Sequence, residues 1–294
     1  MKILSFGEIL FDIIEGDPYL GGAPLNFAAH SAQCGSEAYI FSAVGKDDLG
    51  QLALDKIEAL GVQTTLIQQE EDHPTGTVQV VLDNGQPDYT IVQDVAYDFI
   101  QFPENAEDIW AIAYDVLYFG TLAQRSETSK ETLRQLTEQQ TFQHIFYDVN
   151  LRKESYTEEI IRASLPLCTI LKLNEEEVTV LSGMLYGQEL EPQAFAEKIT
   201  EEYGTQVILI TAGAKGCYVY EQGQLSFSPA EPVTVADAIG AGDAFSAAFV
   251  FKYLNGETAA HAATMANKLG GYVASQRGPI PAYSKEIKAA LGVE

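Results

Sequence analysis

The sequence predicts an α/β fold, in which a mostly parallel central sheet is covered by helices on both faces and carries a small antiparallel lid. Through most of the chain, short apolar runs rich in β-branched and aromatic residues alternate with longer segments of helical periodicity. This alternation is typical of right-handed βαβ units, which build parallel sheets. Two stretches in the N-terminal third break the alternation, and one of them contains an Asn-Gly turn that indicates a hairpin.

The predicted elements follow one another in a regular order. Six apolar runs have the length and composition of buried strands: Ile3–Phe6, Ala38–Val44, Val116–Phe119, His144–Asp148, Thr169–Leu173 and Val207–Thr211. Helical patterns lie between them, at Pro24–Cys34, Gly50–Leu60, Ser126–Gln139, Thr157–Leu165, Glu175–Leu181 and Gln193–Tyr203. Two consecutive helices end the chain on either side of the helix stop Asn255-Gly256, at Ala241–Leu254 and Glu257–Ser275.

Two segments are expected to form the lid. Glu8–Leu20 is extended around the turn residues Gly16-Asp17-Pro18, and Thr75–Asp94 reads as a hairpin with its turn at Asn84-Gly85. Neither segment can join a parallel sheet as a crossover connection. We therefore predict a single domain over residues 1–294, with lid segments inserted at about 8–20 and 75–98.

Composition excludes several classes of function. Lys and Arg total 17 against 42 for Asp and Glu, so the formal net charge is −25, and such a field repels nucleic acids and anionic membranes. The three cysteines are far apart, with no spacing typical of a disulfide framework or a zinc site. The N-terminus lacks a signal-peptide pattern and no run has the length of a membrane span. A cytoplasmic protein without nucleic-acid or membrane partners is expected.

One C-terminal stretch combines a glycine-rich turn, a carboxylate and a long apolar helix. Residues 237–251 read DAIGAGDAFSAAFVF, so Asp243 lies where the helix begins. From these residues alone two interpretations stay open, a helix cap or a catalytic carboxylate beside an anion site. The pattern matches neither a Rossmann fingerprint, which follows the first strand, nor a Walker loop, which needs Gly-Lys-Ser/Thr.

A second signature near the N-terminus makes this stretch more specific. Residues 21–50 read GGAPLNFAAHSAQCGSEAYIFSAVGKDDLG, a Gly-Gly-x-x-x-Asn element followed by a helix, a strand and a Gly-x-Asp-x-x-Gly turn. The two stretches together resemble the signatures of the ribokinase-like, or PfkB-type, carbohydrate kinases, and the N-terminal part is most similar to fructokinases. The resemblance implies a three-layer αβα sandwich with a β lid, and transfer of the γ-phosphoryl group of ATP to a sugar hydroxyl.

The resemblance assigns roles to the residues of the C-terminal signature. Asp243 would be the general base that takes the proton of the attacking hydroxyl, and the N–H groups of Gly240, Ala241 and Gly242 would form the anion hole. Asp237 matches a position that helps to hold a monovalent cation, such as K⁺, in some members. A carboxylate that only orders the loop is the alternative for Asp237.

The same resemblance implies a sugar site near the lid. Asp12 and Asn26 match positions that bind sugar hydroxyls, and Gly21 and Gly22 would let the backbone approach the ligand. Arg152, in DVNLRK (148–153), would direct a positive charge at the sugar or the phosphoryl group; the element follows a buried strand, where open α/β folds place ligands. Glu8 fits the fructokinase-like Gly-Glu opening without a defined role. The alternatives are a turn residue for Asn26, a solvated lid residue for Asp12 and an ordinary ion pair for Arg152.

Further segments match the nucleotide side of the family. Asn174 and Glu177 lie in LNEEEV (173–178) and would position phosphate, with Glu177 reaching Mg²⁺ through water. The turn TAGAKG (211–216) would wrap the ATP phosphates, and one residue of the last long helix would contact adenine; the residues concerned are Thr211, Gly213, Gly216 and Asn267. Helix-capping and plain turn roles remain the alternatives. The four histidines are interpreted as structural or surface residues.

Fructose is the substrate that the sequence favours. Ketodeoxygluconate kinases place an Arg after the second strand of the lid hairpin, where this chain has Gln93 and Asp94, and it has no Lys or Arg from Asn84 through Gln124. A neutral ketohexose therefore comes first, followed by ribose or a nucleoside, and then ketodeoxygluconate. A non-catalytic sugar-binding regulator is the alternative from another class. The exposed lid strands also suggest a homodimer formed through the lid.

Overall fold

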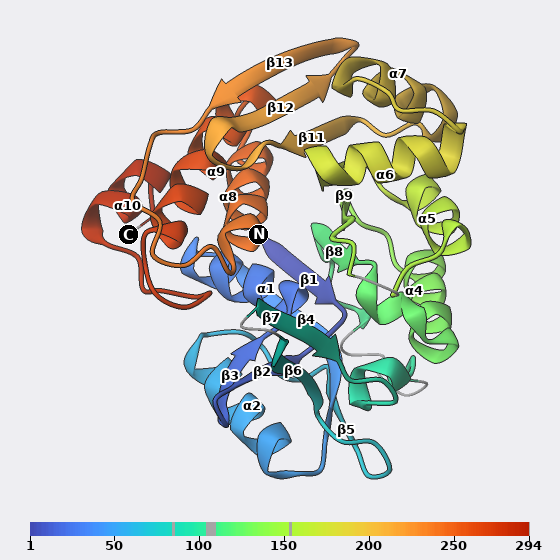
Figure 1. Ribbon diagram of the computed structural model, residues 1–294, viewed down its shortest axis with the longest axis vertical. Coiled ribbons are helices and arrows are strands. Elements are labelled where there is room, and N and C mark those ends of the chain that lie inside the picture. Colours follow the sequence, from blue (N-terminus) through green and yellow to red (C-terminus); the bar gives the residue numbers. More distant parts are fainter. Residues whose placement is uncertain (84–85, 104–109, 153–154, 294) are drawn as a thin grey trace.

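A sheet of nine strands forms the centre of the molecule in the residues that the structure describes, which are 1–83, 86–103, 110–152 and 155–293 (Figure 1). In this computed structural model the strands follow the order β13-β12-β11-β10-β9-β8-β1-β4-β5. Neighbours from β5 to β11 are parallel, whereas β11, β12 and β13 pair antiparallel. The strands are β1 (Lys2–Phe6), β4 (Glu37–Gly45), β5 (Ile67–Glu70), β8 (Val116–Gly120), β9 (His144–Asp148), β10 (Ile170–Asn174), β11 (Val207–Thr211), β12 (Gly216–Glu221) and β13 (Gln224–Pro229).

All six predicted strands are present in this sheet, and the mostly parallel α/β class is confirmed. Three further strands of the sheet, β5, β12 and β13, were not predicted. β5 reads Ile-Gln-Gln-Glu, a polar edge strand whose composition carries no strand signal. β13 is the other edge strand, and most of its side chains are exposed or half-buried.

Strand side chains alternate between two apolar cores, one on each face of the sheet. In β8, Val116 and Tyr118 join one core while Leu117 and Phe119 join the other. The period of two explains why these strands read as continuous apolar runs, since both of their faces are buried. A stacked pair, Phe27 on Tyr118 with ring centroids 3.9 Å apart, fixes helix α1 against the sheet.

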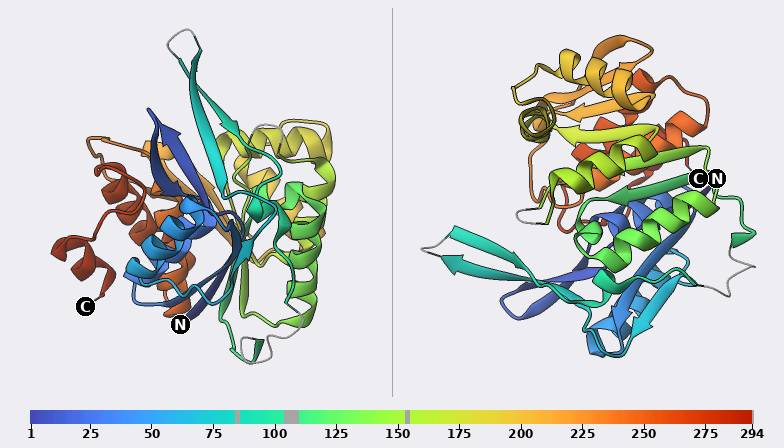
Figure 2. Two further views of the ribbon diagram at one scale, coloured as in Figure 1. Left: turned by 90° about the horizontal axis from the view of Figure 1, so that it is seen from below. Right: turned by 90° about the vertical axis from the view of Figure 1, so that its right-hand side faces the viewer.

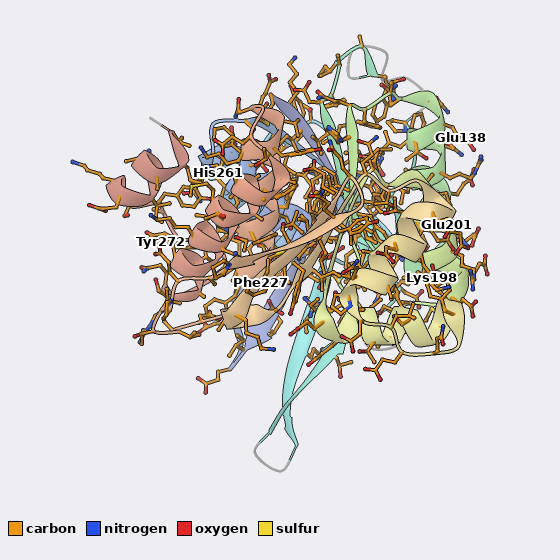
Figure 3. The ribbon with its side chains drawn as sticks, turned by 90° about the horizontal axis from the view of Figure 1, so that it is seen from above. Glu138, Lys198, Glu201, Phe227, His261 and Tyr272 are labelled. Atoms are coloured by element: carbon orange, nitrogen blue, oxygen red, sulfur yellow. The ribbon has the colours of Figure 1, made fainter. Side chains whose placement is uncertain are left out.

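Helices cover both faces, as Figure 2 shows. One face is packed by α1 (Ala23–Gln33), α2 (Asp48–Ala59), α8 (Ala241–Leu254) and α9 (Ala259–Ala274), with the short α10 (Lys285–Leu291) beyond α9. The other face is packed by α4 (Glu127–Gln139), α5 (Glu158–Ser164), α6 (Glu175–Tyr186) and α7 (Pro192–Tyr203). In Figure 3, Glu138 of α4 and Lys198 of α7 lie on one side of the molecule and His261 of α9 on the other. In the described part of the chain, every helix is too short or too polar to cross a bilayer.

A second, four-stranded sheet lies apart from the central one; we call it the lid sheet. Its order is β3-β2-β6-β7, with β2 (Leu10–Ile14), β3 (Asp17–Gly21), β6 (Gly76–Asp83) and β7 (Gln86–Ile91). These strands come from the two segments predicted to form the lid, and they project from the body in Figure 2. Each hairpin is antiparallel, but β2 pairs with β6 in parallel, which the sequence did not indicate. The predicted turn at Asn84-Gly85 lies outside the described residues.

The Gly-x-Asp-x-x-Gly turn at 45–50 anchors the start of lid strand β6. Asp47 caps α2 by accepting a hydrogen bond from the Gly50 N–H at 2.7 Å, and it also accepts bonds from the Thr75 N–H at 2.8 Å and the Thr75 hydroxyl at 2.6 Å. A Cβ at Gly50 would lie 1.9 Å from the carbonyl oxygen of Gly45, so only glycine fits there. The motif therefore has a structural role at the base of the lid sheet.

We predict that Asp47→Ala lowers the free energy of unfolding by about 2 kcal/mol, because it removes a helix cap and leaves the buried Thr75 without its acceptor. Burial acts to raise the pKa of Asp47, but its hydrogen bonds with Thr75 and Gly50 outweigh burial and hold that pKa below its ordinary value. The stabilisation is thus present at neutral pH and is lost as the pH falls through the depressed pKa, below about 4.

Urea unfolding at pH 7 and pH 3 measures this effect. Asp48→Ala is the matched control, since Asp48 is the exposed neighbour on the same helix turn. A loss for Asp47→Ala no larger than for Asp48→Ala would contradict the anchoring role.

Candidate active site

A cavity of about 460 Å³ lies between the lid sheet, the carboxyl ends of the central strands and the N-terminus of α8. The lid sheet and the start of α1 contribute Asp12, Gly21, Gly22 and Asn26 to its wall. All of the predicted sugar-site residues therefore line one cavity, together with Arg152. The catalytic signature meets them there through Gly240, Gly242 and Asp243.

The start of α8 is shaped by a left-handed glycine. Gly240 is the N-cap residue with φ +78, and a Cβ at this position would lie 2.4 Å from the carbonyl oxygen of Pro279. Glycine is required both by the φ value and by this contact. Gly240 and Gly242 line the cavity at this turn, whereas Ala241 does not, and the Ala241 N–H donates to the Ala238 carbonyl at 3.3 Å.

Asp243 and Asn26 are 217 positions apart in the sequence and bonded in the structure. The Asn26 amide donates to Oδ2 of Asp243 at 2.8 Å, which fixes the carboxyl group at the junction of the sugar-side residues and the helix N-terminus. Burial raises the pKa of Asp243 to about 6; Lys172 and Arg152 lower it and Asp148 raises it further. The carboxylate form is thus available at neutral pH, with a proton affinity higher than that of an ordinary Asp.

Lys172 is the site residue that sequence reasoning missed. It lies in the middle of β10, is 9% exposed, lines the cavity and forms an ion pair with Asp148 at 2.8 Å. Tyr118 donates a second hydrogen bond to the same Asp148 oxygen at 2.9 Å. Burial acts to lower the pKa of Lys172, but Asp148 and Asp243 outweigh it and hold the pKa above its ordinary value, so the residue is a cation. Its ammonium nitrogen lies 3.2 Å from where a Cβ of Gly242 would stand.

The DVNLRK element follows β9 and places two polar residues on the cavity wall, Asn150 and Arg152. Asn150 has φ +39, a left-handed conformation that Asn tolerates better than most residues. The backbone after it is held by Glu177, whose Oε1 accepts the Leu151 N–H at 2.8 Å. The strain at Asn150 marks the point where the chain turns to present Arg152 to the cavity.

Asn174 and Glu177 form a capping box at the start of α6. The Asn174 side chain accepts the Glu177 N–H at 2.8 Å, and Oε2 of Glu177 accepts the Asn174 N–H at 2.8 Å. Burial raises the pKa of Glu177, and nearby Asp148 adds to the effect. Both carboxyl oxygens already accept backbone bonds, so the residue holds the loop and helix in place. Its predicted water-mediated link to Mg²⁺ stays a prediction.

None of the other predicted nucleotide residues lines the cavity. Thr211 is the register partner of Asn174 on the adjacent strand, and the turn after it leads into β12. Gly216 has φ +133, and a Cβ there would lie 2.1 Å from the Ser228 carbonyl oxygen; Gly213 also has a positive φ. Asn267 of α9 donates to the Ser228 carbonyl at 2.8 Å, a bond that ties α9 to β13. The contacts of these residues with a nucleotide remain predictions.

Asp237 joins the loop before α8 to the loop after α9. Its Oδ1 accepts the Ile239 N–H at 3.0 Å and its Oδ2 accepts the Gly278 N–H at 3.2 Å. His30 fixes the same second loop from α1, because its Nε2 lies 2.9 Å from the Pro279 carbonyl oxygen. Burial lowers the pKa of His30 to about 4, so it is neutral and structural, as the sequence analysis interpreted it.

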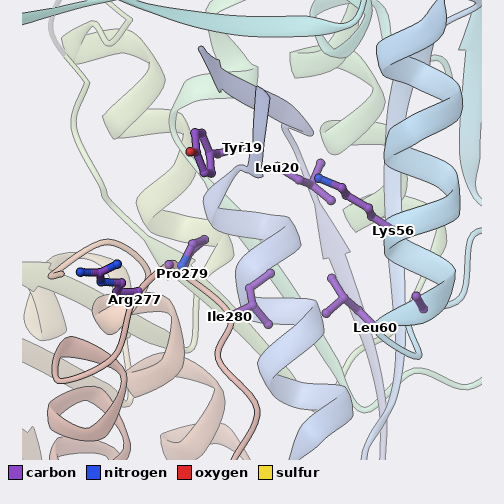
Figure 4. Close-up of a pocket in the computed structure, with 9 residues that line it drawn as sticks. Tyr19, Leu20, Lys56, Leu60, Arg277, Pro279 and Ile280 are labelled. Carbon is purple, nitrogen blue, oxygen red and sulfur yellow. The ribbon is translucent and has the colours of Figure 1, made fainter. Parts of the chain in front are cut away.

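A second pocket of about 390 Å³ lies between β3, α2 and the loop 277–280 (Figure 4). Its wall is mainly apolar, with Lys56 and Arg277 as its two charged residues. None of the residues predicted for catalysis or for sugar binding lines it. No described Asp or Glu lines it, whereas Glu8, Asp12 and Asp243 line the first cavity.

Comparison with known proteins decides the family. The profile of the pfkB family of carbohydrate kinases matches residues 9–286. The chain belongs to this family. The resemblance drawn from the two signatures is thereby confirmed, and with it the assignment of the chain as a carbohydrate kinase.

The family members most useful for comparison are sugar kinases. A putative sugar kinase of Pyrococcus horikoshii is 32% identical over 269 residues, which cover 84% of this chain and 81% of that protein. A fructokinase of Escherichia coli is 29% identical over 262 residues, covering 84% of this chain and 82% of its own. The structure of a fructokinase with bound ATP from Xylella fastidiosa has a TM-score of 0.86 at 20% identity, covering 99% of this chain and 98% of that one. This structural similarity confirms the ribokinase-like fold.

Proposed function

We propose that this family member is an ATP-dependent kinase of a neutral sugar, with fructose as the preferred substrate. One observation carries the proposal: the Asp243 carboxyl group lies in the first cavity, bonded to Asn26, at the point where the sugar-side residues meet the N-terminus of α8. A hydroxyl bound there has a base on one side and the N–H groups of a helix N-terminus on the other.

In the proposed reaction the oxygen of the sugar hydroxyl attacks the γ-phosphorus of ATP while Asp243 accepts the hydroxyl proton. The bond between the γ-phosphorus and the bridging oxygen breaks, and ADP leaves. The N–H groups of Gly240, Ala241 and Gly242 bind the charge on the transferring phosphoryl group. Lys172 and Arg152 stand on the same cavity wall as Asp243 and offset the negative charge that gathers there. Asn26 keeps the carboxyl group in place between these partners.

Mg²⁺ fits this site as a companion of the nucleotide. No group of three metal-ligating side chains is found in the part of the chain that the structure describes. Both carboxyl oxygens of Glu177 already accept a backbone hydrogen bond, so only their remaining lone pairs are available to a metal-bound water. Magnesium commonly keeps water and phosphate ligands, so such a thin protein contribution is sufficient. When bound, it would neutralise phosphate charge. We also propose that Asp237 helps to hold K⁺ between the two loops it joins.

A neutral substrate is supported by the charges around the sugar side of the cavity. Glu8, Asp12 and Asp243 line it, and strands β2, β3, β6 and β7 contain no Lys or Arg. Arg125, the first basic residue after the lid hairpin, is held in a bidentate pair with Asp98 at 2.8 Å. A carboxylate or phosphate on the sugar would meet carboxylates there without a free cation from the lid strands.

Coupled ADP release with a sugar panel tests the proposal. We expect kcat/KM to be highest for fructose, lower for ribose and adenosine, and lowest for ketodeoxygluconate, with activity dependent on Mg²⁺ and raised by K⁺ over Na⁺. A clear preference for the acid would contradict the neutral-sugar assignment. Sugar binding without ADP release from any of the four would instead indicate a non-catalytic regulator.

We further propose a homodimer formed through the lid sheet. Tyr19 and Ile14 are 51% and 39% exposed on its strands and give the lid sheet an apolar surface that a second copy would cover. Light scattering after gel filtration measures the mass, and Tyr19→Glu is expected to shift it toward the monomer.

A further inference from the structure

Glu8 is a buried carboxylic acid on the cavity wall that the proposed mechanism does not use. It directly follows Gly7, whose φ of +139 turns the chain after β1 so that Glu8 lies beneath the start of α1. The residue is 4% exposed and lines the cavity beside Gly22 and Asn26. A Cβ on Gly22 would lie 2.4 Å from the Glu8 carbonyl oxygen, so the Gly21-Gly22 backbone packs directly on Glu8.

Only one of the two oxygens of the Glu8 carboxyl group accepts a hydrogen bond from the described residues. Oε1 accepts the Ala23 N–H at 3.3 Å, whereas Oε2 has no partner among the described residues. Asn26 shows the same deficit: its amide donates to Asp243, which leaves its Oδ1 without a donor in that part of the chain. Two acceptor oxygens of residues that line the cavity therefore lack donors, each with almost no exposed surface of its own, and a buried polar atom is expected to have a donor. A polyhydroxylated ligand supplies donors of this kind.

A structural role is the competing explanation. The Tyr97 hydroxyl and Nη1 of Arg125 also lack partners among the described residues, and both groups lie close enough to Glu8 to interact with its charge. A buried water shared by these three groups would satisfy Oε2 without any ligand. The two explanations differ in what a change at Glu8 does to sugar affinity.

The charges around Glu8 favour a neutral hydroxyl over an anion. Burial raises the pKa of Glu8 to about 7, with Arg152 lowering it and Asp243 raising it. Near neutral pH the group therefore exchanges between a carboxylate, which accepts hydrogen bonds, and a carboxylic acid, which can donate one. The inferred bond uses the carboxylate form, to which a substrate hydroxyl donates; an amide nitrogen in place of Oε2 cannot accept that bond. A substrate carboxylate would be repelled by the ionised form and by Asp243.

We infer that Glu8 is a specificity-determining residue of the sugar site, which hydrogen-bonds a substrate hydroxyl through Oε2 and disfavours anionic sugars. The inference rests on the proposed function, since it places the sugar in this cavity. The inferred contact lies beside Gly22 and Asn26, in the same cavity as Asp243, where the proposed phosphoryl transfer takes place.

Glu8→Gln tests the inference, because Gln keeps the shape and the acceptor for the Ala23 N–H while it puts an amide in place of the ionisable group. We expect KM for fructose, and Kd for fructose measured by calorimetry without ATP, to rise about 10- to 100-fold. KM for ATP should stay within about twofold. The ratio of kcat/KM for fructose to that for ketodeoxygluconate should fall. Asp17→Asn, an exposed acid on β3, is the control expected to change none of these.

The measurements separate the inference from its rivals. A Glu8→Gln variant with lower thermal stability but unchanged fructose Kd would identify the shared-water role and overturn the inference. If the wild-type chain bound fructose without ADP release, and Glu8→Gln weakened that binding, the inference would hold while the proposed function failed. Monodeoxy fructoses identify the hydroxyl that Glu8 contacts. Glu8→Gln should weaken the binding of every analogue that keeps this hydroxyl. It should leave unchanged the binding of the one analogue that lacks it.

Discussion

Asp243→Asn is expected to lower kcat about 10³-fold while KM for ATP changes little. The substitution removes the proton acceptor of the attacking hydroxyl and keeps the size of the side chain, and general-base catalysis of this kind contributes about 10² to 10⁴ in rate. The amide oxygen can still accept the bond from Asn26, so the junction of α1 and α8 is preserved. Steady-state ADP release and ATP binding by calorimetry measure the two quantities.

The pH dependence gives a second readout of the same carboxyl group. Burial raises the pKa of Asp243 to about 6, so the base is ionised above that pH and protonated below it. For the wild-type enzyme, kcat at saturating fructose, which does not depend on sugar binding by Glu8, should fall about tenfold per pH unit as the pH drops below about 6. The residual activity of Asp243→Asn should lack this acidic limb.

Stability should move in the opposite direction from activity. A carboxyl group whose pKa is higher in the folded than in the unfolded state weakens folding at pH values where it is ionised. Asp243→Asn should therefore unfold at the same urea concentration as wild type or a higher one at pH 8. Glu231→Gln, an exposed acid in the segment before α8, is the matched control. Near-normal kcat in Asp243→Asn would refute the general-base role.

The sequence predicted the parts of the fold that depend on local pattern. Strands buried on both faces are apolar at most positions, and the helices between them have their own period, so the βαβ alternation could be predicted. The pairing of strands that are distant in the sequence could not be predicted in this way. The parallel contact of β2 with β6 depends on how Asp47 and Thr75 anchor the second hairpin, and no periodicity encodes that contact. The polar edge strand β5 was missed because its composition carries no strand signal.

Site residues could be predicted where a polar side chain lies close in sequence to a turn that requires glycine. Asp243 with Gly240, and Asn26 with Gly22, both lie in such stretches, and the structure brings Asp243 and Asn26 into contact. Lys172 does not lie beside a glycine-containing turn in the sequence. Its signal was a lysine inside the buried run TILKLN, and a buried lysine needs an anion beside it. Only the pairing of β9 with β10 shows that Asp148 is this anion, opposite Lys172 in the register.

Lys172→Met is expected to lower the free energy of unfolding by about 3 to 5 kcal/mol. The substitution leaves the Asp148 carboxylate buried, 2% exposed in its side chain, with the Tyr118 hydroxyl as its one remaining side-chain donor among the described residues. Lys172 also lowers the pKa of Asp243, so the acidic limb of the activity profile should move to higher pH. Urea unfolding and the pH profile of kcat at saturating fructose measure the two effects. Lys198→Met on α7 is the control, because Lys198 is exposed and does not line the cavity; Figure 3 shows it on the same side of the molecule as Glu138 of α4.

The double variant Asp148→Asn/Lys172→Met separates the stability of the ion pair from the charge of Lys172. A neutral Asn at 148 still accepts from Tyr118 and no longer needs a cation, so most of the lost stability should return. Turnover should stay about 100-fold below wild type, because the positive charge beside Gly242 and Asp243 is still missing. If turnover returned together with stability, Lys172 would be a partner of Asp148 alone. If Lys172→Met lowered the free energy of unfolding by less than about 1 kcal/mol, Lys172 and Asp148 would not form a buried ion pair in solution.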